Sequence, residues 1–273
     1  IPRPAALAQA RRNAQDAAMA PVFHTLRIAR VRRETPDAVS LTFDVPAALT
    51  AAYTFIPGQF LTLRATIDGR DTRRAYSICS GPLEPLRVGI KHVADGVFSA
   101  WANTALRDGD TLSVMTPDGR FGLPGARPVV PLSRLDAPGV RLNLMPSVPD
   151  AGPPPARVVA AFAAGSGITP VLSVLKAVLT DEPSSRFFLF LGNRATESIL
   201  FREEIEDLKD RHLSRLSVFH VLSREQQDIP ILNGRLDGGK PRALLGSVLP
   251  VGAIDQALIC GPSGMIEDLP TVL

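Results

Sequence analysis

Residues that hold metals or cross-link chains are scarce in this sequence. Of its 273 residues only two are cysteines, Cys79 and Cys260, and four are histidines. Two thiols are too few for a disulfide framework, and an iron–sulfur cluster normally needs four thiolates. The histidines are scattered, without the spacing of metal ligands. We therefore expect no metal site, no cluster held by this chain alone, and a reducing, cytoplasmic compartment.

Charge of one sign and long apolar runs are also lacking. The formal net charge is only +3, whereas nucleic-acid-binding domains usually gather a dense basic stripe. No apolar run approaches the length that crosses a bilayer. We therefore expect neither a nucleic acid nor a membrane as partner. The sequence is locally basic from Arg3 to Arg33. This fits a solvated tail and strand face or, alternatively, a docking surface for an acidic redox partner.

Two domains are expected from the chain length and from a change of pattern along it. Residues 22–125 contain short alternating apolar runs, separated by turn residues such as Pro57-Gly58 and Asp108-Gly109. This pattern predicts an antiparallel β-barrel with one short helix, Val97–Leu106. The expected strands are Phe23–Arg33, Val39–Val45, Gln59–Ala65, Arg74–Ile78, Leu86–His92 and Thr111–Met115.

Residues 157–273 follow a different pattern, in which continuous apolar runs alternate with helical periodicity. This predicts an α/β domain whose parallel sheet is covered on both faces. The expected strands are Arg157–Ala163, Phe187–Leu191, Leu216–Leu222 and Gln256–Ile259, and the helices are Thr169–Thr180 and Leu200–Lys209.

Two segments lie outside these domains. Residues 1–21 lack the apolar core of a signal peptide, and we expect them to form a flexible extension. The proline-rich residues 126–156 predict a linker with an exposed insertion.

In the first domain, two short motifs suit a flat ligand that carries phosphate. Arg74-Ala75-Tyr76-Ser77 ends an expected strand. There Tyr76 can stack on a ring system, Arg74 can grip a pyrophosphate and Ser77 can bond a ring nitrogen. Gly96-Val97-Phe98-Ser99 begins the expected helix, whose free N–H groups favour an anion. An ordinary strand end and a glycine turn without a ligand are the alternatives.

In the second domain, two loops follow expected strands. Gly165-Ser166-Gly167-Ile168-Thr169 leads into a helix, where a dinucleotide phosphate needs a close backbone and a helix N-terminus. Pro170 stands where the usual Rossmann pattern has a third glycine, and a purely structural turn is the alternative. Cys260-Gly261-Pro262 follows the last strand, at the sheet edge where α/β proteins bind ligands. Cys260 either faces this crevice or is a buried small hydrophobe.

In this order, the four motifs resemble the ferredoxin–NADP reductase superfamily. Within it the chain is most similar to oxygenase reductase components such as the reductase subunit of phenylacetyl-CoA epoxidase. The similarity covers residues 22–125 and 157–273 and includes Pro57-Gly58-Gln59, Gly119-x-Phe121-Gly122 and Gly192-Asn193-Arg194. It implies an FAD-binding β-barrel followed by an NAD(P)-binding α/β domain. Such a protein takes a hydride from NAD(P)H and passes electrons singly to an iron–sulfur protein or oxygenase component.

The resemblance also implies roles for individual residues. Arg74 and Ser99 would hold the FAD pyrophosphate, Tyr76 would stack on the isoalloxazine, and Ser77 would bond near flavin N5. The other expected flavin-side residues are Ala75, Lys91, His92, Val93, Gly96, Val97 and Phe98. The nicotinamide dinucleotide would contact Gly165, Ser166, Gly167, Ile168, Thr169, Cys260, Gly261 and Pro262. The expected catalytic residues are Tyr76, Ser77 and Cys260.

Three features depart from the family pattern. The insertion at 126–156 is longer than the usual linker, and the last expected helix ends at Leu273, before the family's closing strand. The plant-type [2Fe–2S] domain of the epoxidase reductases is absent from these residues, so that cluster is expected only if a domain follows residue 273.

The choice of nicotinamide cofactor rests on the tips of the second and third expected strands. Arg194, Ser223 and Arg224 stand there, and no acid follows the second strand directly. An arginine at such a position accommodates a 2′-phosphate, so NADPH is favoured over NADH. A hydrolase is disfavoured because neither Ser166 nor Ser263 lies in a Gly-x-Ser-x-Gly frame. A stand-alone ferredoxin–NADP reductase and a non-catalytic flavin-binding module are the remaining alternatives.

Overall fold

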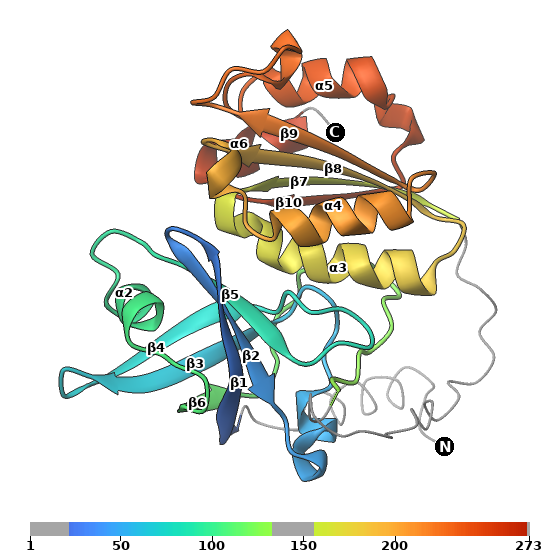
Figure 1. Ribbon diagram of the computed structural model, residues 1–273. Coiled ribbons are helices and arrows are strands. Elements are labelled where there is room, and N and C mark those ends of the chain that lie inside the picture. The colour runs from blue at the N-terminus through green and yellow to red at the C-terminus, as the bar shows by residue number, and fades with distance from the viewer. Residues whose placement is uncertain (1–21, 133–155, 272–273) are drawn as a thin grey trace, which may run out of the picture.

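The computed structural model describes residues 22–132 and 156–271, which form two units stacked on one another in Figure 1. The first unit contains the strands up to residue 115, and the second contains those from residue 158 onward. The predicted N-terminal extension at 1–21 lies outside the described residues. So do residues 133–155 of the predicted linker and residues 272–273.

The first unit is a six-stranded antiparallel sheet in the order β4-β3-β6-β1-β2-β5. The edge strands β4 and β5 meet at an isolated bridge between Ile78 and Val88, so the sheet curls into a half-barrel around an apolar core. The predicted antiparallel architecture is confirmed. Its elements are β1 (Phe23–Thr35), β2 (Ala38–Asp44), β3 (Phe60–Ile67), β4 (Arg70–Ser77), β5 (Arg87–Lys91), α2 (Val97–Thr104) and β6 (Thr111–Met115).

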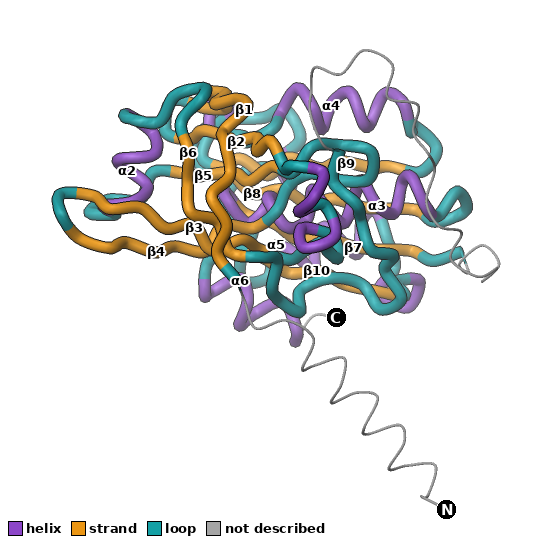
Figure 2. Tube along the Cα trace, turned by 90° about the horizontal axis from the view of Figure 1, so that it is seen from below, coloured by secondary structure: helices purple, strands orange, loops and turns teal. Residues whose placement is uncertain are grey.

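The β3–β4 hairpin is longer than expected, because β4 begins at Arg70 and not at Arg74. Asp68 and Gly69 form its two-residue turn, and both have positive φ angles, of 49° and 74°. A tight hairpin turn of this kind matches the twist of the flanking strands. The residues from Arg70 to Arg74 are mostly exposed and polar, so apolar alternation does not reveal them. In Figures 1 and 2 the hairpin projects from the sheet beside α2.

The second unit is a parallel sheet in the order β10-β7-β8-β9. Helices α3 and α4 cover one face, and α5 and α6 cover the other, as the sequence pattern predicts (Figure 1). Helix α5, which contains Gly246, was not expected from the sequence. The elements are β7 (Val158–Ala164), α3 (Ile168–Asp181), β8 (Arg186–Asn193), α4 (Arg202–Arg211), β9 (Leu216–Leu222), α5 (Lys240–Val248), β10 (Gln256–Cys260) and α6 (Ser263–Asp268).

Short 3-10 turns complete the described chain, at Ala47–Leu49, Ala51–Tyr53, Gly165–Gly167, Thr196–Ser198, Pro230–Leu232, Val251–Ala253 and Leu269–Thr271. None of the described helices is both long enough and apolar enough to span a membrane. Within residues 22–132 and 156–271, no group of three or more His, Cys, Asp and Glu side chains is arranged to hold a metal ion.

Helix α3 lies between the parallel sheet and the first unit (Figure 1). Nearly all of its residues are buried, including Thr169, Ser173 and Lys176. The hydroxyl of Ser173 donates to the carbonyl oxygen of Ser80 across the contact, at 2.7 Å. Because both of its long faces are covered, α3 couples the position of the parallel sheet to that of the half-barrel.

Candidate active site between the two units

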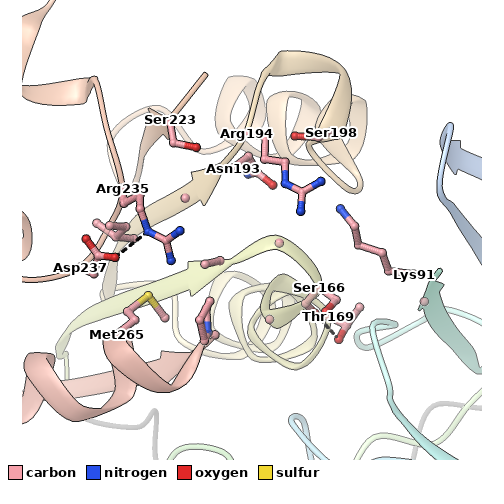
Figure 3. A pocket seen from close by; sticks show the side chains of 18 of the residues that line it. Lys91, Ser166, Thr169, Asn193, Arg194, Ser198, Ser223, Arg235, Asp237 and Met265 are labelled. Atoms are coloured by element: carbon pink, nitrogen blue, oxygen red, sulfur yellow. Dashed lines mark hydrogen bonds and ion pairs between the residues drawn. The ribbon is translucent and has the colours of Figure 1, made fainter. Parts of the chain in front are cut away.

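A cavity of about 910 Å³ opens between the two units. The first unit contributes residues of β4, β5 and the loop after β5, while the second contributes the loops that follow β7, β8, β9 and β10. The carboxyl ends of parallel strands meet at one edge of a sheet, which is where open α/β sheets bind ligands. Figure 3 shows polar side chains from several of these loops converging on the cavity.

On the first-unit side, the cavity is lined by the ends of the two edge strands. Tyr76 and Ser77 come from β4, and Gly89 and Lys91 come from β5. The bridge between Ile78 and Val88 brings these strand ends together, although they are a dozen residues apart in the chain. Ala75 and Val93 also line the cavity, so five of the predicted flavin-side residues reach it.

Tyr76 provides an aromatic wall whose orientation is fixed by packing. Its ring centroid lies 5.7 Å from that of Phe98, which in turn packs edge-on against Trp101 at 5.5 Å. Burial raises the pKa of the Tyr76 phenol to about 12, against the lowering effect of the Arg74 charge. The phenol therefore stays neutral near pH 7 and is a hydrogen-bond donor.

The Gly96–Ser99 motif organises the loop between β5 and α2. The Ser99 hydroxyl accepts from the backbone N–H of Val93 at 3.1 Å and donates to the carbonyl of Gly96 at 3.0 Å. A Cβ at Gly96 would lie 2.5 Å from this hydroxyl, so residue 96 has no room for a side chain. The predicted residues His92, Gly96, Val97, Phe98 and Ser99 are not among those that line the cavity.

Arg74 also lies outside the cavity lining. Its side chain is exposed, and the guanidinium donates to the carbonyl of Arg73 at 2.7 Å. The predicted pyrophosphate contact of Arg74 stays a prediction.

Two family motifs of the first unit are explained by close backbone packing. A Cβ at Gly58 would lie 2.3 Å from the carbonyl oxygen of Phe121, and one at Gly122 would lie 2.7 Å from that of Pro57. Gln59 adds a side-chain bond to the carbonyl of Gly119, at 3.4 Å. The Pro57-Gly58-Gln59 and Gly119–Gly122 segments thus hold each other in place and do not line the cavity.

The two glycines of the loop after β7 have different roles. Gly165 has φ +54°, and no heavy atom lies within 4 Å of where its Cβ would be. It lines the cavity together with Ser166, Gly167 and Thr169. A Cβ at Gly167 would lie 2.0 Å from the carbonyl oxygen of Cys260. Gly165 therefore supplies a left-handed turn beside open space, while Gly167 allows the loop to touch the end of β10. Ile168, also predicted here, is fully buried in the core.

Cys260 does not face the cavity, whereas Gly261 and Pro262 line it. The Cys260 side chain is half-buried and packs against the core that includes α3, on the same side of β10 as Leu258. Burial raises the pKa of its thiol, so the neutral thiol predominates near pH 7. The buried-hydrophobe interpretation describes this side chain better than the crevice-facing one, because residues 258 and 260 share a strand face.

The loops after β8 and β9 contribute cationic, hydroxyl and amide groups to the cavity. Arg194, Ser198 and Ser223 line it, and the buried Nδ2 of Asn193 has no hydrogen-bond partner among the described residues. An unpaired buried donor is costly unless a ligand oxygen accepts from it. These groups therefore fit an oxygen-rich ligand such as the phosphates or ribose of a dinucleotide.

Sequence reasoning missed Arg235, whose side chain lines the same cavity near Asp237 and Met265 (Figure 3). Its Nε lies 2.7 Å from an oxygen of Asp237. The predicted Arg224 is not in the lining, although its backbone N–H donates to the carbonyl of Arg194 at 2.8 Å. The sequence feature that could have pointed to Arg235 is the Asn233-Gly234 turn directly before it. In the structure, a parallel bridge joins Asn233 to Leu222 at the end of β9.

Comparison with known protein families agrees with this geometry. Residues 25–122 match the oxidoreductase FAD-binding domain, and residues 162–270 match the oxidoreductase NAD-binding domain. The chain joins an FAD-binding to an NAD-binding oxidoreductase domain. The predicted fold class and the resemblance to the ferredoxin–NADP reductase superfamily are thereby confirmed. FAD and a nicotinamide dinucleotide are the cofactors of these domains.

Two curated relatives are oxygenase components. The chain is 40% identical over 252 residues to a 1,2-phenylacetyl-CoA epoxidase subunit of Escherichia coli, covering 92% of this chain and 64% of the relative. It is 31% identical to the ferredoxin reductase component of 3-ketosteroid-9-alpha-monooxygenase of Rhodococcus rhodochrous, covering 91% and 60%. The chain thus spans less than two thirds of the length of these relatives.

Solved structures show the same fold at low identity. The CS-b5R domains of human Ncb5or superpose with a TM-score of 0.70 at 22% identity, covering 93% of this chain and 66% of that one. Ferredoxin-NADP+ reductase from Plasmodium falciparum gives a TM-score of 0.66 at 18% identity, covering 93% and 91%. At these identities the likeness concerns the fold alone.

Proposed function

We propose that this chain is the FAD- and NAD(P)H-binding part of an oxidoreductase that takes a hydride from NAD(P)H and passes electrons on singly. The observation that carries the proposal is the shared cavity. Tyr76 and Ser77 of the FAD-binding domain line the same space as Gly165 and Asn193 of the NAD-binding domain. Two reactants bound to these walls are held close together, and such orientation is a large part of catalysis for hydride transfer.

The chain's own groups contribute placement, since bound FAD supplies the redox chemistry by accepting a hydride and releasing electrons singly. Tyr76 offers a fixed aromatic surface and a neutral phenol to the flavin ring. The Ser77 hydroxyl lies at the end of the same strand and is the proposed hydrogen-bond partner near flavin N5. The Gly165 loop and Pro262 form the opposite wall, where the nicotinamide half is proposed to lie.

The nicotinamide cofactor is proposed to be NADPH. Arg194 and Arg235 reach the cavity from different loops, with Ser223 beside them. Two guanidinium groups can bind the 2′-phosphate through charge-assisted hydrogen bonds. The proposed partners are therefore Arg235 and the predicted Arg194 and Ser223, whereas Arg224, also predicted, does not line the cavity.

The electron acceptor is proposed to be an iron–sulfur protein or an oxygenase component. The names of the relatives from Escherichia coli and Rhodococcus rhodochrous, one part of an epoxidase and the other a monooxygenase reductase component, support this choice. We further propose a cytoplasmic location, which the two free thiols support.

The test is to purify the whole gene product, record its absorption spectrum and titrate it with NADPH and NADH. A flavin spectrum that bleaches on addition of NADPH, with turnover of a dye acceptor, is the expected result. A folded protein that cannot be reconstituted with FAD contradicts the proposal. FAD binding without oxidation of either nucleotide would instead identify a non-catalytic flavin-binding module.

A further inference from the structure

A buried cluster of charged side chains joins the two domains at a distance from the cavity. It comprises Lys176 on α3, Glu204 on α4, Arg87 on β5 and Glu84 in the loop before β5. The side chain of Lys176 is only 5% exposed, and those of Arg87 and Glu204 are 14% and 22% exposed. Even when they are paired, buried charges often stabilise a protein no more than apolar side chains of similar volume, so this arrangement calls for a functional explanation.

The contacts of the cluster cross the domain boundary in both directions. Lys176 contacts Glu204 of its own domain, and it reaches Glu84 at 2.7 Å and the carbonyl of Cys79 at 3.3 Å in the FAD-binding domain. Both carboxylate oxygens of Glu204 accept from Arg87, at 2.7 Å each. Glu204 is therefore held between a cation of each domain.

The neighbouring cations keep the Glu204 carboxylate ionised although it is mostly buried. Burial acts to raise the pKa of Glu204, but the charges of Lys176 and Arg87 outweigh it, and the pKa lies below its usual range. The guanidinium of Arg87 also stacks over the ring of Phe201, at 5.2 Å from the centroid. The hydrogen bonds from Arg87 to both carboxylate oxygens of Glu204, together with its contact with Phe201, restrict the domain contact more than apolar packing would.

The same two elements, β5 and α3, carry residues of the cluster and residues of the cavity wall. Arg87 is two residues before Gly89 and four before Lys91 on β5, and both of these residues line the cavity. Lys176 is seven residues, or about two helical turns, after Thr169 on α3. Gly89 has no room for a side chain, because its Cβ would lie 2.9 Å from both Thr169 and Phe201. A shift at the cluster would therefore be transmitted to the cavity walls.

We propose that Lys176, Glu204 and Arg87 are positioning residues, which hold the FAD-binding and NAD-binding domains at the separation that hydride transfer requires. This inference rests on the proposed function. The three side chains do not line the cavity. They act through β5 and α3, so their loss affects the rate of hydride transfer more than the affinity for either nucleotide. A displacement of about 1 Å between reacting groups can cost roughly 10²-fold in rate.

The kinetic test compares Lys176→Met and Glu204→Gln with the parent protein in stopped-flow reduction of bound FAD by NADPH. We expect the limiting rate constant to fall fivefold or more, while the Kd values for FAD and NADPH change by less than threefold. The matched control is Glu203→Gln. Glu203 also forms a cross-domain ion pair, with Arg32 at 2.8 Å, but its side chain is 79% exposed. Such pairs contribute little, so its rate should stay within twofold of the parent.

A second readout does not depend on catalysis. Cys79 is fully buried at the domain contact, and the sequence has only one other cysteine, Cys260. In a Cys260→Ser background without NADPH, the reaction of Cys79 with a thiol reagent reports on separation of the domains. We expect Lys176→Met and Glu204→Gln to speed this reaction at least fivefold, and Glu203→Gln to leave it unchanged.

The proposal is overturned if the limiting rate constants of both variants fall less than fivefold, or if FAD and NADPH affinities fall in parallel with the rate. Arg87→Lys keeps the charge but loses the planar guanidinium that contacts Glu204 and Phe201, so it provides the same comparison should the first two variants not fold. Failure of the parent protein to oxidise NADPH would refute the proposed function. The Cys79 reaction would still show whether the cluster holds the domains together.

Discussion

Gly167 and the carbonyl oxygen of Cys260 are in contact so close that a Cβ on residue 167 would lie 2.0 Å from that oxygen. Gly167 lies in the turn after β7 and Cys260 ends β10, and these two strands pair with Ala163 opposite Cys260. The atom that a side chain would meet is backbone and has little freedom to move. The second glycine of the Gly-Ser-Gly loop is therefore required for packing, and the first for its φ of +54°.

Replacing each glycine separately distinguishes these roles. We expect Gly167→Ala to lower the free energy of unfolding by about 3 kcal/mol, because overpacking against backbone forces a shift of β10. Gly165→Ala adds a methyl into open space and should cost only about 1 kcal/mol, the strain of a left-handed residue. Denaturant unfolding of both variants measures the difference. Equal losses in the two proteins would contradict the assignment.

Ser77 is the residue on which the proposed flavin contact depends. We expect Ser77→Ala to slow single-turnover reduction of bound FAD by about tenfold, because a hydrogen-bonded group contributes about 1.4 kcal/mol at the transition state. The amount of bound FAD should hardly change. Ser99→Ala is the comparison, since that hydroxyl holds the Val93–Gly96 loop and does not line the cavity. An unchanged rate constant in Ser77→Ala would remove its proposed role.

The arginines in and near the cavity allow a test of cofactor choice. Arg235→Ala should raise the Kd for NADPH tenfold or more and that for NADH by less than twofold, because only NADPH carries the 2′-phosphate. Arg224→Ala is the matched variant, with an expected change in the NADPH Kd of less than threefold, because Arg224 does not line the cavity. Fluorescence titration with both nucleotides gives the four constants. Equal loss of NADH and NADPH binding in Arg235→Ala would argue against a 2′-phosphate site.

We expect the ionisation of Tyr76 to affect how the free energy of unfolding depends on pH. Burial raises the pKa of its phenol from 10.0 to about 12 in the folded protein. A raised folded-state pKa means that the unfolded chain loses this proton first. The stabilising contribution is therefore complete below pH 10 and is lost as the pH rises toward 12.

The chain has only two tyrosines, and burial also raises the pKa of Tyr53. In a Tyr53→Phe variant, the ultraviolet absorbance of tyrosinate follows Tyr76 alone. We expect half-ionisation well above pH 10 while the protein is folded, and near pH 10 in denaturant. A midpoint near pH 10 in the folded variant would show that the Tyr76 phenol is exposed to solvent.

Local patterns predicted most of the regular structure. The strands Thr111–Met115 and Leu216–Leu222 have the predicted bounds, and the other predicted strands and helices differ mainly at their ends. The N-terminal half of β4 was missed because its arginines do not alternate with apolar residues. Helix α5 was missed because Pro241 and Gly246 interrupt a short pattern.

The candidate site was predicted less completely. Gly165 and Arg194 were found because they follow apolar runs, and Tyr76 and Ser77 because their motif ends an expected strand. The orientation of Cys260 and the entry of Arg235 into the cavity depend on neighbours that lie far away in the sequence. Neither the orientation of Cys260 nor the position of Arg235 produces a periodic pattern in the sequence.

The sequence by itself determined that an antiparallel sheet precedes a parallel one and that glycine-rich turns follow its strands, because hydrophobic period and turn residues are local properties. Only the tertiary structure decided which side chains share the cavity and that Lys176, Glu204 and Arg87 meet across the domain contact. Lys176 and Arg87 are separated by nearly ninety residues, and the free energy of pairing each of them with Glu204 depends on burial that exists only after both domains have folded.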